Sequence, residues 1–405
     1  MISLPATPEV SATWLRELQR LHDATRQRPP CDLADRLRAL GIDTTARYAG
    51  LTIPHPFGKA SGQLSHTLSQ VEADVEAGVA FVVLKTVIAE DATAERTMEA
   101  WVTGDTLMRV EQRVAEDGRT GWTVTWNGRG WGGSLADYLE FFARSQLAAK
   151  ARDVPVIPSV KYLLPGVGED FRVAEYEHTT RQLLAVWDEV GCGGEMILEK
   201  DFSPTLAGDA RAQSPERVLD WLRAVAGLID AAAPGRVRIG VKLMNAVRDD
   251  RFQVEMMRTL IQESARAPDF LVVFNRLFDR ERGIAYGGWD LSNRNLRVLE
   301  QAWREIDRLP PLSATGNICS GRLMVEYALC GCENGQLHTF FQLPLSAYTA
   351  TGGSRSARAL HTLLLHPSEG LAAWLRHLHE SGYLGERDGQ VRFLDLVERG
   401  REGKR

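Results

Sequence analysis

Short apolar segments alternate along this chain with longer segments in which apolar residues recur at helical spacing. The short segments are rich in Val, Ile and Phe and have the length of buried strands. Eight of them predict strands, at 56–60, 81–87, 154–160, 195–200, 237–243, 270–275, 312–315 and 335–339. Helices are predicted at 68–77, 135–152, 173–190, 215–233, 251–265, 293–306, 321–329 and 357–378. Eight strand–helix units in this order predict an α/β fold, a single (β/α)8 TIM barrel.

Two features depart from a plain barrel. Residues 107–126 alternate in polarity around Asp117-Gly118, which predicts a β-hairpin inserted after the second strand. The chain before the first strand has helical periodicity. We therefore expect an N-terminal helical extension (1–50), the barrel (51–385) and a C-terminal tail (386–405).

Composition excludes several classes of protein. The 405 residues are 44% hydrophobic and 25% charged, as in average globular domains. A net charge of −5 argues against nucleic-acid binding, which needs a basic face. No apolar stretch approaches the roughly 20 residues of a membrane span, and no secretory signal is present. Five cysteines suit neither a disulfide framework nor an iron–sulfur centre, so we expect a cytoplasmic protein.

Lysines stand at the carboxyl ends of four predicted strands, where barrels carry their chemistry. They are Lys85, Lys161, Lys200 and Lys242. An ammonium group is costly to bury without a partner, so each lysine is expected to face an anion, a carbonyl-rich ring or a carboxylate. Lys242 could hold a flavin edge, form a Schiff base as in an aldolase, or pair with an acidic side chain.

The segments 314–321 and 335–339, where the last two predicted strands end, contain glycines and hydroxyl groups. Such loops hold phosphate in many barrels, although the glycines could also be simple turn residues. The histidines and cysteines lack the spacing of metal ligands, so no metal site is predicted.

A set of motifs follows in order along the chain, at Pro-Phe-Gly-Lys-Ala-Ser-Gly (56–62), 78–86, 241–243, 274–275, 287–288, 314–321 and 331–339. Together they resemble the motifs of the dihydroorotate dehydrogenase family. The chain is most similar to the soluble class and to the pyrimidine-reducing domain of dihydropyrimidine dehydrogenase. The resemblance covers about 51–385. It implies an FMN-binding barrel that transfers a hydride between flavin N5 and a carbon–carbon bond of a small substrate.

The resemblance also implies site residues. The residues expected to bind FMN are Ala60, Ser61, Lys85, Thr86, Lys242, Gly287, Gly288, Gly316, Asn317 and Thr339. Lys85 would lie beside the ring and Lys242 at its N1/O2 edge, whereas the glycines, Asn317 and Thr339 would lie on the phosphate side. Ser203, immediately before a proline, occupies the place of the catalytic Cys or Ser and would transfer a proton.

Departures from the family concern the substrate. Its asparagines are mostly replaced, because Lys200, Thr205 and Gly133 stand in their places, and Asn317 and His338 replace glycines of the phosphate loops. An amide offers a donor and an acceptor, whereas a lysine offers only donors. We therefore expect an anionic substrate other than dihydroorotate. The residues expected to bind it are Asn127, Lys161, Lys200, Asn275 and Arg276.

Three alternatives stay open at this point. One is a Schiff-base aldolase or lyase on the same barrel, using Lys242 or Lys200. Another is a non-catalytic barrel that binds a ligand. If the chain is an oxidoreductase, its external electron donor or acceptor is unknown, and analogy with related barrels suggests a homodimer.

Overall fold

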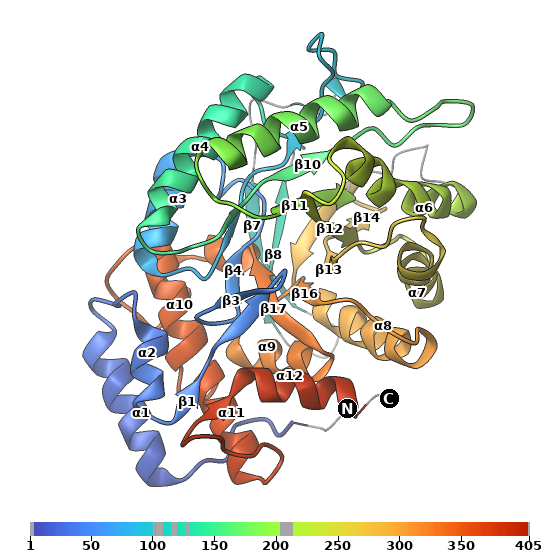
Figure 1. Cartoon of the computed structure of the whole chain (residues 1–405). Helices are drawn as coiled ribbons and strands as arrows, with labels where there is room; N and C mark the ends of the chain where they lie inside the picture. Colours follow the sequence, from blue (N-terminus) through green and yellow to red (C-terminus); the bar gives the residue numbers. More distant parts are fainter. Residues whose placement is uncertain are drawn as a thin grey trace.

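A computed structural model describes residues 4–99, 102, 108–114, 120–126, 130–202 and 214–403. Its centre is a curved sheet of ten parallel strand segments, with helices packed around it (Figure 1). The strand order is β6-β10-β11-β12-β13-β16-β17-β4-β5-β9. This α/β architecture fits a TIM-like fold. No helix in the described ranges is long and apolar enough to span a membrane.

The central strands lie close to their predicted positions. In chain order they are β4 (Phe57–Lys59), β5 (Val82–Val83), β6 (Val87–Ile88), β9 (Val156–Ile157), β10 (Ser159–Lys161), β11 (Met196–Phe202), β12 (Val237–Met244), β13 (Phe270–Asn275), β16 (Leu312–Thr315) and β17 (Cys332–Leu337). Two predicted strands are each broken into two segments. Pro158, which has no N–H to donate, separates β9 from β10.

These broken strands bring distant parts of the strand order together. β9 pairs with β5, and β10 pairs with both β6 and β11. Only Pro158 separates β9 from β10. The segment 156–161 therefore pairs with β6, at one end of the strand order, and with β5, near its other end.

Helices alternate with the strands and cover the outside of the sheet (Figure 1). They are α3 (Leu68–Ala77), α4 (Leu135–Lys150), α5 (Val173–Glu189), α6 (Pro215–Ala232), α7 (Asp250–Arg258), α8 (Leu291–Glu305) and α9 (Gly321–Leu329), and a π-helical turn (Thr259–Glu263) follows α7. Capping boxes start two of them. Thr67 and Gln70 exchange hydrogen bonds at α3, and Ser134 and Asp137 do so at α4.

The two strands of the predicted hairpin are present as β7 (Met108–Val114) and β8 (Thr120–Trp126), which pair antiparallel. The predicted turn at Asp117-Gly118 lies outside the described residues. It belongs to a second sheet of order β14-β15-β8-β7, in which β14 (Leu277–Asp279) and β15 (Ile284–Gly288) were not predicted. This sheet carries Gly287 and Gly288 to the carboxyl end of the central strands, beside the short 3-10 helix Thr339–Gln342.

The N-terminal extension is only partly helical. Two helices, α1 (Ala12–Thr25) and α2 (Leu33–Arg38), precede three short strands, β1 (Ile42–Asp43), β2 (Ala46–Tyr48) and β3 (Leu51–Ile53). Tyr48 of β2 lies between the rings of Phe81 and Phe270, at 4.0 and 5.5 Å between ring centroids. The extension therefore supplies part of the core beneath the amino ends of the strands.

The single helix predicted at 357–378 is wrong. The structure has α10 (Arg355–Leu365) and α11 (Leu371–Glu380), with an additional 3-10 turn at Leu345–Ala347. The helix ends at His366 because the next residue, Pro367, disfavours helical backbone in the residue before it.

The segment expected to be a tail contributes ordered structure. β18 (Val391–Arg392) pairs with β1, and α12 (Phe393–Glu402) packs against α9. Phe393 and Leu396 are fully buried. The N-terminal extension and the C-terminal segment thus share one small sheet, formed by β1 and β18.

Candidate functional site

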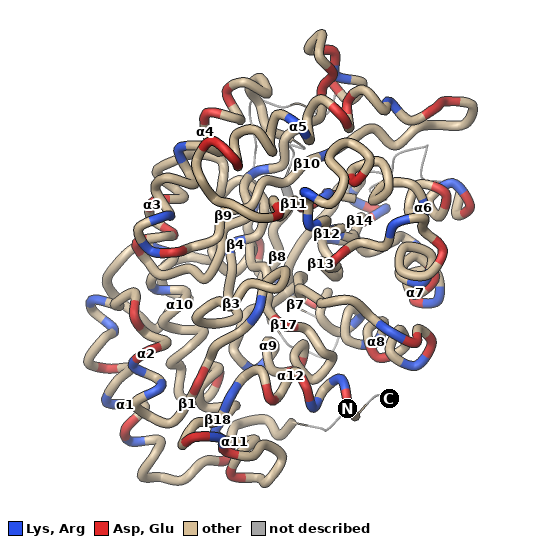
Figure 2. The backbone as a smooth tube through the Cα atoms, in the orientation of Figure 1, with Lys and Arg blue, Asp and Glu red and all other residues tan. Residues whose placement is uncertain are grey.

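Charged side chains line the concave face of the central sheet. Side chains alternate along a strand, so Glu199 and Asp201 of β11 share one face, and Asp201 lies in register with Lys242 of β12. Lys161 at the end of β10 joins them through an ion pair of 3.2 Å between its Nζ and Asp201 Oδ2. All four side chains are buried. In Figure 2, blue and red segments occur among the central strands as well as on the outer helices.

Hydroxyl groups connect the Lys161–Asp201 pair to the first strand. Ser61 Oγ lies 2.9 Å from Thr86 Oγ1, which lies 3.0 Å from Ser159 Oγ. Thr86 Oγ1 also donates to Asp201 Oδ2 at 3.5 Å. These groups come from four adjacent strands and form a polar path from Ser61 to a buried carboxylate.

Lys85 follows β5 and is 7% exposed. Its ammonium group makes no hydrogen bond or ion pair with any described residue. Burial, with contributions from Lys161 and Arg276, lowers its pKa from 10.5 to about 7. The side chain lines a cavity of about 430 Å³ whose other walls include Gln63 and Trp131. An anion or a carbonyl oxygen in this cavity would meet an unused donor.

Lys242 is 2% exposed and makes one hydrogen bond, from Nζ to Gln336 Oε1 at 3.0 Å. Gln336 Nε2 donates in turn to Glu199 Oε1, which also accepts from Tyr48 Oη at 2.7 Å. An ammonium group has three N–H donors. Two of those on Lys242 therefore have no partner within the described ranges.

Two further groups lie at this end, the cationic Arg276 and the neutral ring of His338. Arg276 is 8% exposed and immediately follows β13. His338 follows β17, where its ring lies against Gly62. Burial and then the charges of Lys59, Lys85, Lys242 and Arg276 lower the pKa of His338 to about 3, so its ring is neutral at pH 7.

Lys200 does not join this group. It lies on the same face of β11 as Phe202, which packs against Trp221 of α6. Its Nζ donates to the Asp201 carbonyl at 3.1 Å and lies 5.9 Å from the Tyr162 ring centroid. The structure therefore does not bring Lys200 together with Glu199 and Asp201, because its side chain lies between the sheet and the helices. Burial lowers its pKa to about 7.

The residues expected on the phosphate side are brought together at the strand ends. Gly288 has a φ of +101°, and a Cβ there would lie 2.3 Å from Trp122 O and 2.9 Å from Thr339 Cγ2. Gly316 has a φ of +93°, and a Cβ there would lie 2.7 Å from Phe274 O. Asn317, at a φ of 56°, donates from Nδ2 to Ser292 Oγ at 3.0 Å. Both glycines permit contacts that a larger residue would prevent.

Backbone donors in this group are unused. The N–H groups of Asn317 and Thr339 make no hydrogen bond with the residues that the structure describes. The first turn of α9 differs, because Arg322 N donates to Glu369 O at 3.2 Å and Leu323 N to Ser320 Oγ at 3.1 Å. A phosphate would therefore meet the loop amides rather than these amides of α9.

The remaining predicted residues are placed as follows. Ala60 is buried at the end of β4, where its N–H donates to Leu337 O at 2.9 Å. Gly287 pairs with Val124 of the hairpin. The side-chain amide of Asn275 makes no hydrogen bond with the described residues, and the residue is partly exposed. Ser203 and Asn127 lie outside the described residues.

These residues fit FMN. Lys242 offers unused N–H donors for a ring edge that gains negative charge, and the loop amides offer donors for a phosphate. Lys85 offers a third, independent donor at the same end of the sheet.

Sequence reasoning missed Glu199, Asp201, Ser159 and Gln336. Glu199, Ser159 and Gln336 are polar residues inside predicted apolar strands. This feature was interpreted only where the polar residue is a lysine. Asp201 immediately follows the predicted strand at 195–200. The alternation of side chains along β11 would have placed it with Lys161 and Lys242.

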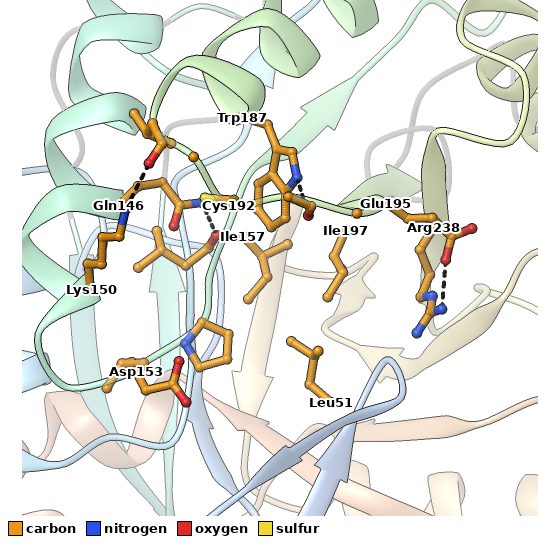
Figure 3. A pocket seen from close by; sticks show the side chains of 17 residues that line it. Leu51, Gln146, Lys150, Asp153, Ile157, Trp187, Cys192, Glu195, Ile197 and Arg238 are labelled. Carbon is orange, nitrogen blue, oxygen red and sulfur yellow. Dashed lines mark hydrogen bonds and ion pairs between the residues drawn. The ribbon is translucent and has the colours of Figure 1, made fainter.

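A second cavity, of about 500 Å³, lies at the amino ends of the strands (Figure 3). Its walls include Leu51, Ile157 and Trp187. At its rim Arg238 pairs with Glu195 at 2.7 Å, and Lys150 Nζ donates to Val190 O at 3.3 Å. None of the predicted site residues lines it.

No model of a known protein family matches the chain, and no curated protein sequence is significantly similar to it. The fold and the site define an α/β protein with a curved parallel sheet and a cationic site at the carboxyl ends of its strands.

Proposed function

We propose that this chain is an FMN-dependent oxidoreductase that transfers a hydride between flavin N5 and a carbon–carbon bond of a small anionic substrate other than dihydroorotate. One observation carries the proposal. Two almost buried ammonium groups, those of Lys85 and Lys242, have N–H donors that no described residue accepts. They lie at the same end of the sheet as a loop cluster with backbone amides that the described residues also leave unused. The charges of both lysines act on His338, which directly precedes Thr339 of that cluster.

The proposal includes a finer description of the fold. The ten parallel segments correspond to eight barrel strands, with β5 and β6 forming the second and β9 and β10 the third. The fold is then a (β/α)8 barrel with the hairpin inserted after its second strand. The pairing of β10 with both β6 and β11 supports this description.

The chain's residues divide the work between cofactor and substrate. FMN would supply two-electron chemistry as a hydride acceptor or donor. Lys242 would stabilise negative charge at the ring edge, and Gly288, Gly316, Asn317 and Thr339 would hold the phosphate. Lys85 would orient a carbonyl or carboxylate in the adjoining 430 Å³ cavity. Lys161 and Arg276 add positive charge and favour an anionic substrate.

Proton transfer is assigned to Ser203 by the family resemblance. A serine needs help to act as a base. Asp201, two residues earlier in the chain, ends the path of hydroxyl groups that starts at Ser61. This path keeps polar groups hydrogen-bonded at the strand ends and holds Asp201 in a fixed position beside Lys161.

FMN binding tests the proposal directly. Purified protein should show flavin absorbance, or should quench FMN fluorescence when titrated with it. Lys242→Met should weaken FMN binding about tenfold to a hundredfold, because a buried hydrogen bond to a charged group contributes about 1.5–3 kcal/mol. Lys150→Met removes an exposed lysine at the opposite end of the strands and should leave FMN affinity unchanged. A wild-type protein that fails to bind FMN would refute the proposal.

A second candidate function rests on Lys85. A Schiff-base enzyme needs an amine that is deprotonated near neutral pH and faces a cavity. The pKa of Lys85 near 7 and its place in the 430 Å³ cavity meet both needs. Lys242 is bound to Gln336, and Lys200 lies behind the sheet. Borohydride trapping with carbonyl compounds, followed by peptide mapping, distinguishes the two functions, because only the Schiff-base enzyme gives an adduct at Lys85.

A further inference from the structure

Glu199 is a fully buried carboxyl group that the proposed function does not use. It lies on β11 two residues before Asp201, so its side chain also faces the concave side of the sheet. Isolated buried carboxylates are costly, so a group in this position has either a counter-charge or a bound proton. The contacts around Glu199 show which positive charge balances its negative charge.

Gln336 connects Glu199 to Lys242. Its Oε1 accepts from Lys242 Nζ at 3.0 Å, and its Nε2 donates to Glu199 Oε1. Since ammonium can only donate and a carboxylate oxygen accepts, these two contacts fix the orientation of the amide. The amide therefore bridges the two groups and holds them at constant separation.

The two oxygens of Glu199 differ. Oε1 accepts from both Gln336 and Tyr48 Oη, the latter at 2.7 Å. Oε2 is buried and has no hydrogen-bond partner within the described ranges. Oε1 is thus arranged for a negative charge, whereas Oε2 is free to carry a proton.

Three titratable groups face Glu199. The charge of Lys242 favours its ionised form, and that of Asp201 opposes it. Tyr48 stays neutral, because burial raises the pKa of its phenol well above the usual range. Burial raises the pKa of Glu199 itself above its usual value of 4.5. Its charge is therefore sensitive to any change of charge beside Lys242.

We propose that Glu199 is the counter-charge of Lys242 and takes up a proton from solvent when negative charge arrives beside Lys242. The inference rests on the proposed function, in which flavin reduction brings that charge. Hydride transfer from the substrate delivers two electrons and one proton and leaves one additional negative charge in the site. One proton bound at Glu199 Oε2 restores the original charge, and the reverse reaction releases it.

Coupling of this kind is reciprocal. If reduction favours protonation of Glu199, protonation of Glu199 favours reduction. An ionised Glu199 therefore lowers the midpoint potential of bound FMN, whereas a protonated one does not. Glu199 is a positioning residue in this account, because it acts on the flavin only through Gln336 and Lys242.

The test is the midpoint potential of bound FMN, measured against reference dyes from about pH 6 to pH 9. In wild-type protein the potential should fall more steeply with pH than in Glu199→Gln. The two curves should converge as the pH falls, because protonation removes the charge that distinguishes the glutamate from glutamine. At the alkaline end the potential of Glu199→Gln should be the higher one. Infrared difference spectra of wild-type reduction should show a new protonated-carboxyl band, and Glu199→Gln should lack it.

Two other variants make the test specific. Glu195→Gln makes the same chemical change at an exposed residue paired with Arg238 and should leave the curve unaltered. Tyr48→Phe keeps the aromatic stack but removes a donor to the ionised carboxylate, so the steep region should move to higher pH. It also tests the inference if Glu199→Gln does not fold.

The outcomes separate the inference from the proposed function. Bound FMN with the same potential curve in wild type and Glu199→Gln would overturn the role of Glu199 alone. Parallel curves with a constant offset would do the same, because Glu199 would then be a permanent charge. Absence of FMN binding by wild-type protein would overturn the function and the inference together.

Discussion

Replacing Asp201 with asparagine tests the electrostatic structure of the site. Asp201 is paired with Lys161 at 3.2 Å, and the two side chains are 10% and 1% exposed. At an effective dielectric constant of about 20, the attraction at this distance amounts to about 5 kcal/mol. Asparagine keeps the shape but removes the charge, so the ion pair with the buried ammonium of Lys161 is lost.

We expect Asp201→Asn to lose about 3–5 kcal/mol of unfolding free energy, the usual result of removing one partner from a buried pair. Lys161→Met should cost less, because Asp201 would still interact with Lys85 and Lys200, whose pKa values it raises. We therefore expect a larger loss of unfolding free energy from Asp201→Asn than from Lys161→Met.

Urea denaturation at pH 7 measures these differences. Glu195→Gln is the matched control, since its ion pair with Arg238 is 2.7 Å long but its side chain is 43% exposed. Exposed pairs contribute less than about 1 kcal/mol, so this variant should stay close to wild type. The reasoning fails if Asp201→Asn costs no more than Glu195→Gln, or if Lys161→Met is the more damaging change.

Three further predictions concern single residues. Because the pKa of Lys85 is near 7 in the folded protein and 10.5 when unfolded, the unfolded chain binds more protons between these values and stability rises with pH there. Lys85→Met should flatten that rise in urea titrations at several pH values, whereas an unchanged slope would contradict the burial of Lys85. Lys200→Met should stabilise the protein by about 1–4 kcal/mol without altering FMN affinity, because its surroundings are largely apolar; weaker FMN binding would place Lys200 in the site instead. Gly316→Ala should cost about 1–3 kcal/mol of stability and weaken FMN binding, since its φ is +93° and Phe274 O lies 2.7 Å from the new Cβ; calorimetry that shows neither change would refute its role.

Hydrophobic periodicity predicted much of the fold. The strands at 270–275 and 312–315 and the helices at 68–77 and 321–329 have the observed bounds. These segments are buried on a regular repeat and are bounded by caps or turns, so local sequence determines them. The α10–α11 break and the strands β14 and β15 were missed. The break was overlooked although residues 366–370 contain Pro367 and Gly370, which are typical of a turn. β15 owes its conformation to pairing with the hairpin, which no local pattern shows.

The site was predicted in part. The four lysines were identified because a lysine in an apolar strand is conspicuous. The side of the sheet on which each lysine lies was not predicted, because a shift of one residue moves a side chain to the other side of a sheet. Lys200 and Asp201 differ by that one residue, and only the pairing of β11 with β10 and β12 shows that Asp201 faces Lys161 while Lys200 faces the helices.

The Lys242–Gln336–Glu199 bridge could not have been predicted from local patterns. Its members come from β12, β17 and β11, and Tyr48 reaches Glu199 from the N-terminal extension. Their contacts depend on the curvature of the whole sheet. The resemblance to a flavin-dependent family named Lys242 but gave no reason to look for a carboxyl group behind it.

Native mass spectrometry of the full chain, as isolated and after incubation with FMN, tests the central claim most directly. Our account predicts one FMN bound per chain, retained in Lys150→Met and reduced or lost in Lys242→Met. A bare polypeptide mass after incubation with excess FMN, from protein that is folded by circular dichroism, would contradict it.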